Sequence, residues 1–396
     1  MKNKKKLILL IAIIVISNIG TYFFTVNGML SFGHHYVFST GDEEVADHVS
    51  KLLELEKIIQ SDYYKDVDEA TVMDGAIKGM FDAIGDKYSA YYTKDEFKSL
   101  METSTGTYEG IGIVVTEDDD KNTVVVTPYK GTPAGDAGIQ TGDVIIKVDG
   151  EDVTGKGSDY AVSKMRGDAG TKVNVTVKRN DQEISYDLER QSIDEQTVSS
   201  SVINDNVGYI SISEFTQKTG DDFNSQLNDL QAKGITSLVI DLRYNGGGLV
   251  DSAVSVADRL LGDTEVVYTV KKDGERQDYK SSGDVKFDKP IVVLVNEGTA
   301  SASEILAGAI QDTGAGTLVG TKTFGKGIVQ EVKSLSDGSG YKLTTAEYFT
   351  PNGRNIHGIG LTPNTVIDQN PDYKNTLSVP QDQDTQLQKA LEIVSK

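Results

Sequence analysis

Residues 237–248 read SLVIDLRYNGGG, an apolar run of strand length that passes into a polar turn and three glycines. Nearly continuous apolar character is typical of a strand that is buried on both faces, as in a parallel sheet covered by helices. A second run of this kind, Ile291–Val295, is followed by GTASASE at 298–304, and a third strand is expected at Val207–Ile212. The helices expected between and after these strands are Asp221–Ala232, Val250–Leu261 and Ser303–Ile310. This alternation predicts a layered, mixed α/β domain over residues 192–370.

The residues before this domain follow other patterns. Residues 42–106 show helical spacing of apolar residues, with a helix over about Glu69–Ile84 that stops at Gly85. Residues 107–191 instead predict a β-rich module. Its expected strands are Gly112–Thr116, Thr123–Thr127, Val144–Val148, Lys172–Lys178 and Glu183–Leu188, with one helix at Ser158–Met165. A strand at Gly340–Phe349 and a helical tail over 371–396, with its helix near Asp384–Val394, are also expected.

The first 30 residues predict a membrane anchor. Met1–Lys6 is basic, and the apolar stretch Leu7–Phe24 has about the minimum length for a spanning helix. No clear small-residue cleavage motif follows it. The basic flank is expected to stay in the cytoplasm, so the chain would be a single-pass membrane protein with its remaining residues extracytoplasmic. A cleaved signal that releases a secreted protein is the alternative.

Composition argues against several classes of function. The chain has 396 residues, with 39 Lys and Arg against 60 Asp and Glu, and a net charge of −21. Such acidity argues against a nucleic-acid partner, because phosphate binding needs a basic face. The chain has no cysteine, so disulfides, thiolate metal sites and a cysteine nucleophile are excluded. Four histidines offer little for a metal centre, and no metal is expected.

Three segments could carry chemistry: 241–248, 298–304 and 323–330. Ser301 lies where a strand gives way to a helix, whose first N–H groups and partial positive charge would stabilise an oxyanion. The same Ser301 and Glu304 also fit a capping box, which serves only helix stability. Ser303 and Thr299 are rival hydroxyls.

A serine nucleophile needs a base, and only His357 among the histidines lies in the C-terminal half. A lysine can serve if it is desolvated enough to be neutral, and Lys326 lies between two glycines in an apolar stretch. It could equally be an ordinary surface lysine. Gln330 could hold its amine, and the glycine run Gly246–Gly248 could donate N–H groups to an oxyanion.

Residues 107–191 resemble a PDZ domain. The segments that carry the resemblance are Tyr108–Ile113, Gly131–Ala134, Ala137–Ile145 and Val148–Gly150. In such a domain the loop residues Gly110, Ile111, Gly112 and Ile113 would bind a chain-terminal carboxylate through backbone N–H groups. The strand after the loop would accept an extended peptide at its edge.

Together with this module, the three chemical segments resemble the carboxyl-terminal processing peptidases, Ser–Lys serine proteases with an embedded PDZ domain. The resemblance covers roughly residues 45–395 and includes Gly85–Ser89, with Lys87 where the family usually has Pro, and Phe349–Arg354. It implies Ser301 as nucleophile, Lys326 as general base and Gln330 as orienter of the lysine. The implied oxyanion donors are the N–H of Ala302 and of a glycine in the run, such as Gly246 or Gly247.

Arg166 opens a phrase, RGDAGT at 166–171, that resembles the family's Arg-Gly-x-x-Gly-Thr. One hypothesis is that Arg166 contacts the protease body when ligand is bound and so couples the two domains. The alternative is a surface arginine that caps the end of a helix.

The resemblance implies a membrane-anchored serine endopeptidase that captures protein substrates by free apolar C-termini and needs no cofactor. It also implies a crotonase-like core and a homo-oligomer, expected to be a dimer, formed through the terminal helical regions. Three alternatives stay open: a catalytically silent PDZ adaptor of the envelope, a hydrolase that uses His357, and a crotonase-like acyl-binding enzyme built around the glycine run.

Overall fold

The computed structural model describes residues 31–32, 35–36, 43–283, 287–373 and 379–395. The chain divides into two compact units, Met1–Gly85 and Asp86–Lys396. The anchor predicted over residues 1–30 lies outside the described residues. Within the described ranges, no helix combines the length and the apolar character that a membrane crossing requires.

The first unit is helical. A short hairpin of β1 (Ser31–Phe32) and β2 (His35–Tyr36) precedes α2 (Glu43–Asp62) and α3 (Glu69–Asp82). The helix expected from Glu69 is confirmed, and it begins where the carboxylate of Asp68 accepts the N–H of Thr71 at 2.8 Å. The two helices leave several large apolar side chains exposed: Leu52, Leu55, Ile58 and Ile59 of α2, and Met80 of α3. The unit ends inside the predicted helical region 42–106, so the last helix of that region belongs to the second unit.

The second unit contains a six-stranded sheet that carries the expected buried strands. Its spatial order is β12 (Val198–Ile203), β13 (Val207–Ile212), β14 (Ser237–Asp241), β17 (Ile291–Val295), β18 (Thr317–Gly320) and β21 (Thr365–Val366). From β13 onwards the strands are parallel, and β12 forms an antiparallel hairpin with β13. The parallel order brings the ends of β14 and β17, and therefore the two loops of interest, to the same edge.

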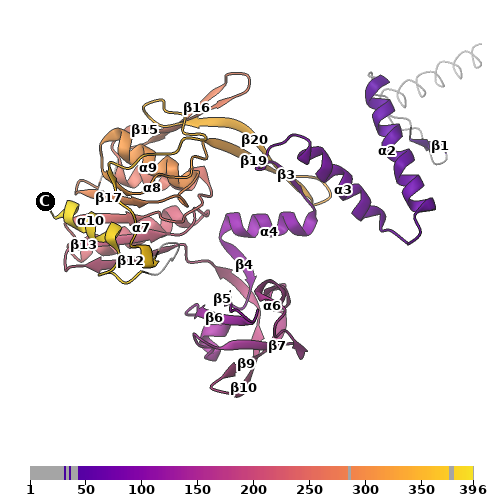
Figure 1. Cartoon of the computed structure of the whole chain (residues 1–396), viewed down its shortest axis with the longest axis horizontal. Helices are drawn as coiled ribbons and strands as arrows, with labels where there is room; N and C mark the ends of the chain where they lie inside the picture. The colour runs from indigo at the N-terminus through magenta and orange to yellow at the C-terminus, as the bar shows by residue number, and fades with distance from the viewer. Residues whose placement is uncertain (1–30, 33–34, 37–42, 284–286, 374–378, 396) are drawn as a thin grey trace, which may run out of the picture. The chain divides into compact units, whose positions relative to one another are not determined.

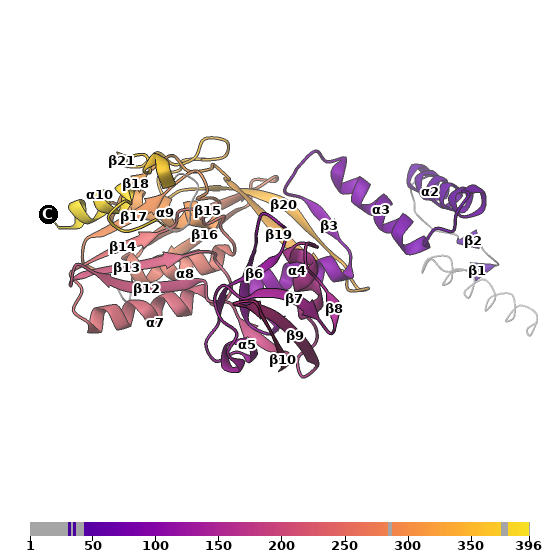
Figure 2. The ribbon, with the colours of Figure 1, turned by 60° about the horizontal axis from the view of Figure 1, so that its bottom comes forward.

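Helices cover both faces of this sheet. On one face lie α7 (Thr219–Ala232), α8 (Val250–Leu260) and α9 (Ala302–Thr313), and on the other lies α10 (Thr385–Val394) (Figures 1 and 2). Side chains alternate along a strand, so Val293 packs in the first layer and Leu294 in the second. This double covering explains why β14 and β17 are apolar throughout.

A second sheet lies beside α8 and α9. Its order is β16 (Arg276–Ser281), β15 (Thr264–Lys271), β20 (Gly340–Phe349) and β19 (Ile328–Ser334), and β3 (Ala90–Tyr92) also pairs with β20. The strand expected at 340–349 is confirmed. The antiparallel register sets Gln330 of β19 opposite Thr344 of β20, which matters for the site below.

The β-rich module has its own apolar core. Its sheet runs β10 (Gln182–Glu189), β9 (Lys172–Arg179), β7 (Val144–Val148), β6 (Thr123–Pro128) and β5 (Ile113–Glu117), with β8 (Glu151–Asp152) on β7. Two helices complete it, α5 (Pro133–Ala137) and α6 (Ser158–Met165). The strand β5 is an edge strand that pairs with β6 alone among the described strands.

Three elements join the module to the α/β core. They are α4 (Lys94–Thr105), β4 (Thr107–Gly110) and β11 (Gln191–Asp194), and β4 pairs with β11 (Figure 1). Helix α4 begins with a capping box of Thr93 and Glu96 and ends at Gly106 in the left-handed conformation. A Cβ at Gly106 would lie 2.7 Å from the hydroxyl of Thr216 in the core. A 3₁₀ turn, η1 (Pro371–Tyr373), precedes the C-terminal helix.

Candidate active site

Ser301 occupies a strained position at the sharp turn between β17 and α9. Its φ of 57° and ψ of −119° are unusual for a residue with a side chain. Such strain persists only where the surroundings over-determine it, and it concentrates at functional sites. A serine on a sharp strand-to-helix turn is also how other hydrolases present a nucleophile.

The rival hydroxyls are engaged elsewhere. Ser303 is fully buried and donates to the carbonyl oxygen of Asn245 at 3.0 Å. Thr299 is also fully buried and donates to the carbonyl oxygen of Leu242 at 2.8 Å. Both bonds fasten the turn to the loop after β14. Ser301 is partly exposed and lines a cleft, which neither rival does in the part of the chain described.

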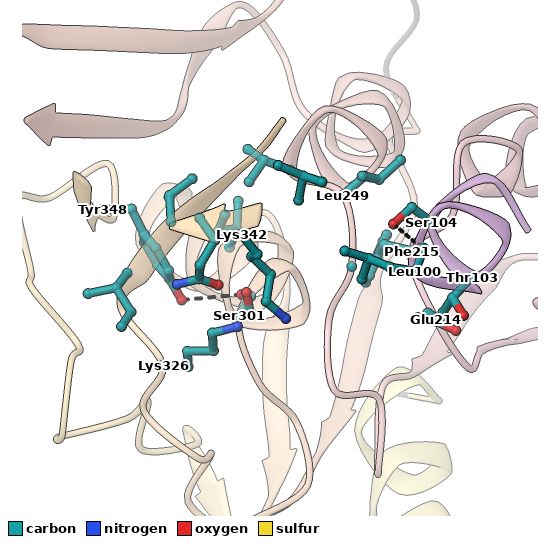
Figure 3. Close-up of a pocket in the computed structure, with 17 residues that line it drawn as sticks. Leu100, Thr103, Ser104, Glu214, Phe215, Leu249, Ser301, Lys326, Lys342 and Tyr348 are labelled. Carbon is teal, nitrogen blue, oxygen red and sulfur yellow. Dashed lines mark hydrogen bonds between the residues drawn. The ribbon is translucent and has the colours of Figure 1, made fainter. Parts of the chain in front are cut away.

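This cleft has a volume of about 260 Å³. About half of its lining is apolar, and the charged and polar groups inside it include Glu214, Ser301, Lys326, Gln330 and Lys342 (Figure 3). Its apolar lining residues are Leu100, Phe215, Leu249, Val250, Ile305, Ile328, Val329 and Val332. Helix α4 also contributes polar residues, Thr103 and Ser104. The cleft can therefore hold an apolar side chain next to a small reactive group.

Lys326 extends its amine into this cleft toward Ser301 (Figure 3). The amine lies 4.8 Å from the centre of the Tyr88 ring. Burial lowers the pKa of Lys326, and the positive charge of Lys342 lowers it further, against the opposing charges of Asp86 and Glu304. Lys326 can therefore be neutral at a lower pH than an ordinary lysine, as a general base requires.

Gln330 is held by a chain of hydrogen bonds that ends on a carboxylate. Its amide donates to the hydroxyl of Thr344 at 3.2 Å, and that hydroxyl donates to Asp86 at 2.6 Å. Burial raises the pKa of Asp86, but hydrogen bonds from Ser89, Thr344 and the Tyr88 N–H outweigh burial and lower it. No hydrogen bond between Gln330 and Lys326 is present among the described residues, so the orienting role of Gln330 stays a prediction.

Glu304 is the residue that the sequence interpretation undervalued. Its side chain is 0% exposed. One carboxylate oxygen accepts the N–H of Ser301 at 3.0 Å and the N–H of Lys326 at 2.9 Å. The other oxygen accepts the hydroxyl of Thr323 at 2.5 Å and the N–H of Gly325 at 2.9 Å. A single buried carboxylate thus fixes the backbones of Ser301 and Lys326, although the two are far apart in sequence.

The glycine run approaches the Ser301 turn closely. A Cβ at Gly247, whose φ is 108°, would lie 2.8 Å from the Cβ of Ser301 and 3.0 Å from the N of Ala302. The N–H of Gly247 already donates to the side chain of Asn245 at 2.9 Å. The N–H groups of Gly246, Gly248 and Ala302 have no acceptor among the described residues. The predicted oxyanion donors Ala302 and Gly246 are therefore available, whereas Gly247 is occupied.

His357 lies in the turn after β20 with its side chain exposed. Its backbone passes Gly327 so closely that a Cβ there would lie 2.6 Å from the N of His357. The cleft of Ser301 is lined by Lys326 and not by His357. In the described part of the chain, no group of three or more His, Cys, Asp or Glu residues is placed to hold a metal ion.

The four residues predicted to bind a peptide carboxylate lead into the edge strand β5. The carbonyl oxygen of Ile111 accepts the N–H of Ala134 at 2.9 Å, and that of Gly112 accepts the hydroxyl of Thr132 at 3.1 Å. Gly112 has a φ of 78°, and a Cβ there would clash with Thr132 at 2.4 Å. Gly110 ends β4 and Ile113 begins β5. The loop is thus rigidly attached beside an open strand edge.

Arg166 links this module to α4. Its guanidinium donates to Glu102 at 3.0 Å and lies 5.1 Å from the centre of the Tyr108 ring. Glu102 lies on the helix that also lines the cleft of Ser301. The carbonyl oxygens of Lys164 and Met165, at the end of α6, instead accept hydrogen bonds from Arg190 at 3.0 and 2.9 Å. The side chain that caps α6 is therefore Arg190, a residue that the sequence interpretation missed.

Comparisons with known proteins give a consistent result. Family models match for peptidase family S41 over residues 206–367, for a PDZ domain over 124–179, and for the N-terminal domain of the activating protease CtpB over 15–96. The carboxy-terminal processing protease CtpA of Bacillus subtilis is 38% identical over 376 residues, which cover 94% of this chain and 79% of that protein.

Two further comparisons agree. A probable CtpA-like serine protease of Staphylococcus haemolyticus is 37% identical over 384 residues, which cover 96% of this chain and 76% of that protein. The solved structure of a putative S41 protease from Bacteroides fragilis is 17% identical, with a TM-score of 0.53 over 86% of this chain and 97% of that one, a likeness of fold.

Proposed function

The chain belongs to the carboxy-terminal processing proteases of peptidase family S41, serine-type peptidases with a PDZ domain, and on this premise we propose that it cleaves proteins with a Ser301–Lys326 dyad. The observation that carries the proposal is the buried carboxylate of Glu304. It holds the backbones of Ser301 and Lys326 together at one cleft, where Lys326 is desolvated.

The dyad would work by proton transfer between two side chains. Neutral Lys326 takes the proton of the Ser301 hydroxyl as its oxygen attacks the peptide carbonyl. The N–H of Ala302, and that of a glycine whose N–H has no acceptor among the described residues, Gly246 or Gly248, would stabilise the oxyanion. The ammonium of Lys326 then gives its proton to the leaving amine, and an acyl-enzyme remains. Water, deprotonated by Lys326, hydrolyses the ester and restores Ser301.

Substrate recognition would begin at the PDZ domain. An extended tail adds to the free edge of β5, and its terminal carboxylate reaches the N–H groups of the loop Gly110–Ile113. The open edge and the rigid loop support this proposal. The apolar lining of the Ser301 cleft favours an apolar side chain next to the cleaved bond, and an apolar tail is expected at the PDZ domain.

Arg166 would carry the signal of an occupied PDZ domain to the cleft. It contacts Glu102 on one side of α4, while Leu100 and Ser104 of the same helix line the cleft. A peptide on the module that changes this ion pair would therefore bias the position of α4.

The finer points of organisation are proposals of the same kind. Residues 1–30 would form a single-pass anchor with the catalytic part outside the membrane, or a signal that is cleaved on secretion. The doubly covered parallel sheet supports a crotonase-like core. The exposed apolar side chains of α2 support a second copy of this chain as partner, which would give a dimer.

The test follows cleavage of an unfolded protein by the full chain, and of peptides with free or amidated apolar C-termini. Ser301→Ala and Lys326→Ala should each lower cleavage by at least about 1,000-fold, since both members of a dyad act as a unit. Amidation should weaken cleavage of the same peptide. Binding of free C-termini with no cleavage by the wild type would instead indicate an adaptor.

A further inference from the structure

One face of β20 forms a wall of the catalytic cleft. Lys342 and Thr344 are alternate residues of β20 and share a face, and Tyr348 follows an irregularity in the pairing of β20 with β19. Thr344 holds Gln330, and the hydroxyl of Tyr348 donates to the carbonyl oxygen of Ser301 at 3.2 Å. Lys342 and Tyr348 both line the cleft beside Ser301 and Lys326. Lys342 is the member of this face without a role in the dyad described above.

The ammonium of Lys342 has no carboxylate partner among the described residues. It is half-buried, and it lies 5.7 Å from the centre of the Tyr92 ring. Figure 3 shows it extending toward Ser301 from the side opposite Lys326. The protein has a net charge of −21, so acidic side chains outnumber basic ones. A lysine in this cleft without a carboxylate partner is a departure from that excess of acidic groups.

The other charged groups around Lys326 do not form an ion pair with its amine. The carboxylate of Glu304 accepts four hydrogen bonds, including that of the Lys326 N–H, and the carboxylate of Asp86 accepts those of Ser89 and Thr344. The ring of Tyr88 lies against the amine, and Lys87 lies 4.9 Å from the centre of the same ring. A protonated Lys326 would thus face a second ammonium without a partner of its own.

We propose that Lys342 keeps Lys326 neutral and ready to act as the base, by making the doubly protonated cleft unfavourable. Placing two positive charges in one desolvated site is costly in free energy, so one of the two amines is favoured in its neutral form. In agreement, the charge of Lys342 follows burial as a cause of the lowered pKa of Lys326. Lys342 would be a positioning residue, because it acts through Lys326 by disfavouring the protonated form of that amine. The inference rests on the proposed dyad.

The experiment measures the pH profile of kcat/KM for the full chain with a peptide of uncharged apolar side chains and a free C-terminus, comparing wild type, Lys342→Met and Lys342→Arg. Lys342→Met keeps the apolar stem and removes the charge, so the rising limb should move to higher pH while the plateau is retained. Below the limb, the rate should fall by roughly tenfold for each pH unit of that movement. Lys342→Arg should restore the wild-type limb.

Lys333→Met supplies the matched control, because Lys333 is an exposed lysine of the neighbouring strand β19 that pairs with Glu331 at 2.8 Å. It should leave the limb in place. A Lys342→Met profile lowered equally at every pH, or unchanged, would overturn the inference. So would a loss confined to peptides with acidic side chains, because that would assign Lys342 to substrate binding. Activity retained in Lys326→Ala would instead overturn the dyad itself.

Discussion

Two glutamates of the second unit bind partners that are distant in sequence, and they do so in opposite environments. Glu304 is fully buried in α9 and accepts four hydrogen bonds from the segments of Ser301 and Lys326. Glu102 of α4 forms an ion pair with Arg166, whose side chain is 44% exposed. A buried carboxylate must have every partner in place, because leaving any of them unpaired is costly. An exposed ion pair contributes little and can be exchanged.

The difference assigns separate tasks to the two clusters. The Glu304 cluster fixes a geometry in which a strained serine and a desolvated lysine face one another. In the role proposed above, the Arg166–Glu102 pair would be a link that opens and closes as the PDZ domain is filled. Stability and catalysis should therefore respond strongly at Glu304, whereas only regulation should respond at Arg166.

Within this comparison, Glu304→Gln is the variant expected to lower both stability and activity strongly. A glutamine offers one acceptor oxygen in place of two and adds donors that face other donors, so buried N–H groups lose their acceptors. We expect unfolding free energy to fall by about 2–3 kcal/mol and kcat/KM to fall by at least about 100-fold. Denaturant unfolding and peptide cleavage measure the two quantities. The control is Glu347→Gln, which changes an exposed carboxylate of β20. Equal effects of the two variants would refute the distinction between the buried and the exposed glutamate.

A third carboxylate distinguishes the effect of burial on stability from an effect on catalysis. Asp384, at the start of α10, pairs with Arg243 at 2.8 Å, and its side chain is nearly fully buried, away from the cleft. Asp384→Asn should lower unfolding free energy by about 3 kcal/mol while the folded fraction keeps most of its kcat.

The pH dependence gives that variant a second readout. Burial raises the pKa of Asp384, but hydrogen bonding and charge from Arg243 outweigh burial and lower it. The stabilisation is therefore present above the pKa of the unfolded chain and is lost as pH falls through the folded pKa. The difference between wild type and Asp384→Asn should be full at neutral pH and shrink below about pH 4. A constant difference down to the acid limit would show that the pair is not its origin.

The smallest effect on stability is expected for Arg166→Ala, about 0–1 kcal/mol because the pair is exposed. Basal cleavage of a short peptide should hardly change, whereas stimulation by a second peptide with a free apolar C-terminus should decrease. Glu102→Gln should reproduce this loss, and the double variant should add nothing to it. If basal and stimulated cleavage were unchanged in both single variants, the coupling role would be wrong.

The sequence was most informative where local pattern and burial coincide. The strands β14 and β17 are apolar throughout because helices cover both of their faces, so their type and place could be predicted. The motifs around Ser301 and Lys326 led to one cleft for the same reason, since parallel strands end at one edge. The strands β15, β16 and β19 were missed because their partly polar runs gain their pairing from distant strands.

The site residues that the sequence interpretation missed also depend on partners that are distant in sequence. Glu304 was visible only as a local capping partner, although two of its acceptor bonds reach Gly325 and Lys326. Arg190 caps α6 from a position 25 residues beyond Met165. The alternation along 340–349 sets Lys342 on the face of Thr344. Lys342 could have been found from this pattern only once it was known that this face lies at the catalytic cleft.

Covalent trapping of the nucleophile tests the central claim most directly. The full chain is treated with a fluorophosphonate, and the modified residue is identified by mass spectrometry in wild type, Lys326→Ala and His357→Ala. The dyad predicts modification at Ser301 that is retained in His357→Ala and lost in Lys326→Ala while the variant stays folded. Modification of another residue, or labelling of Ser301 that persists without Lys326 and disappears without His357, would contradict it.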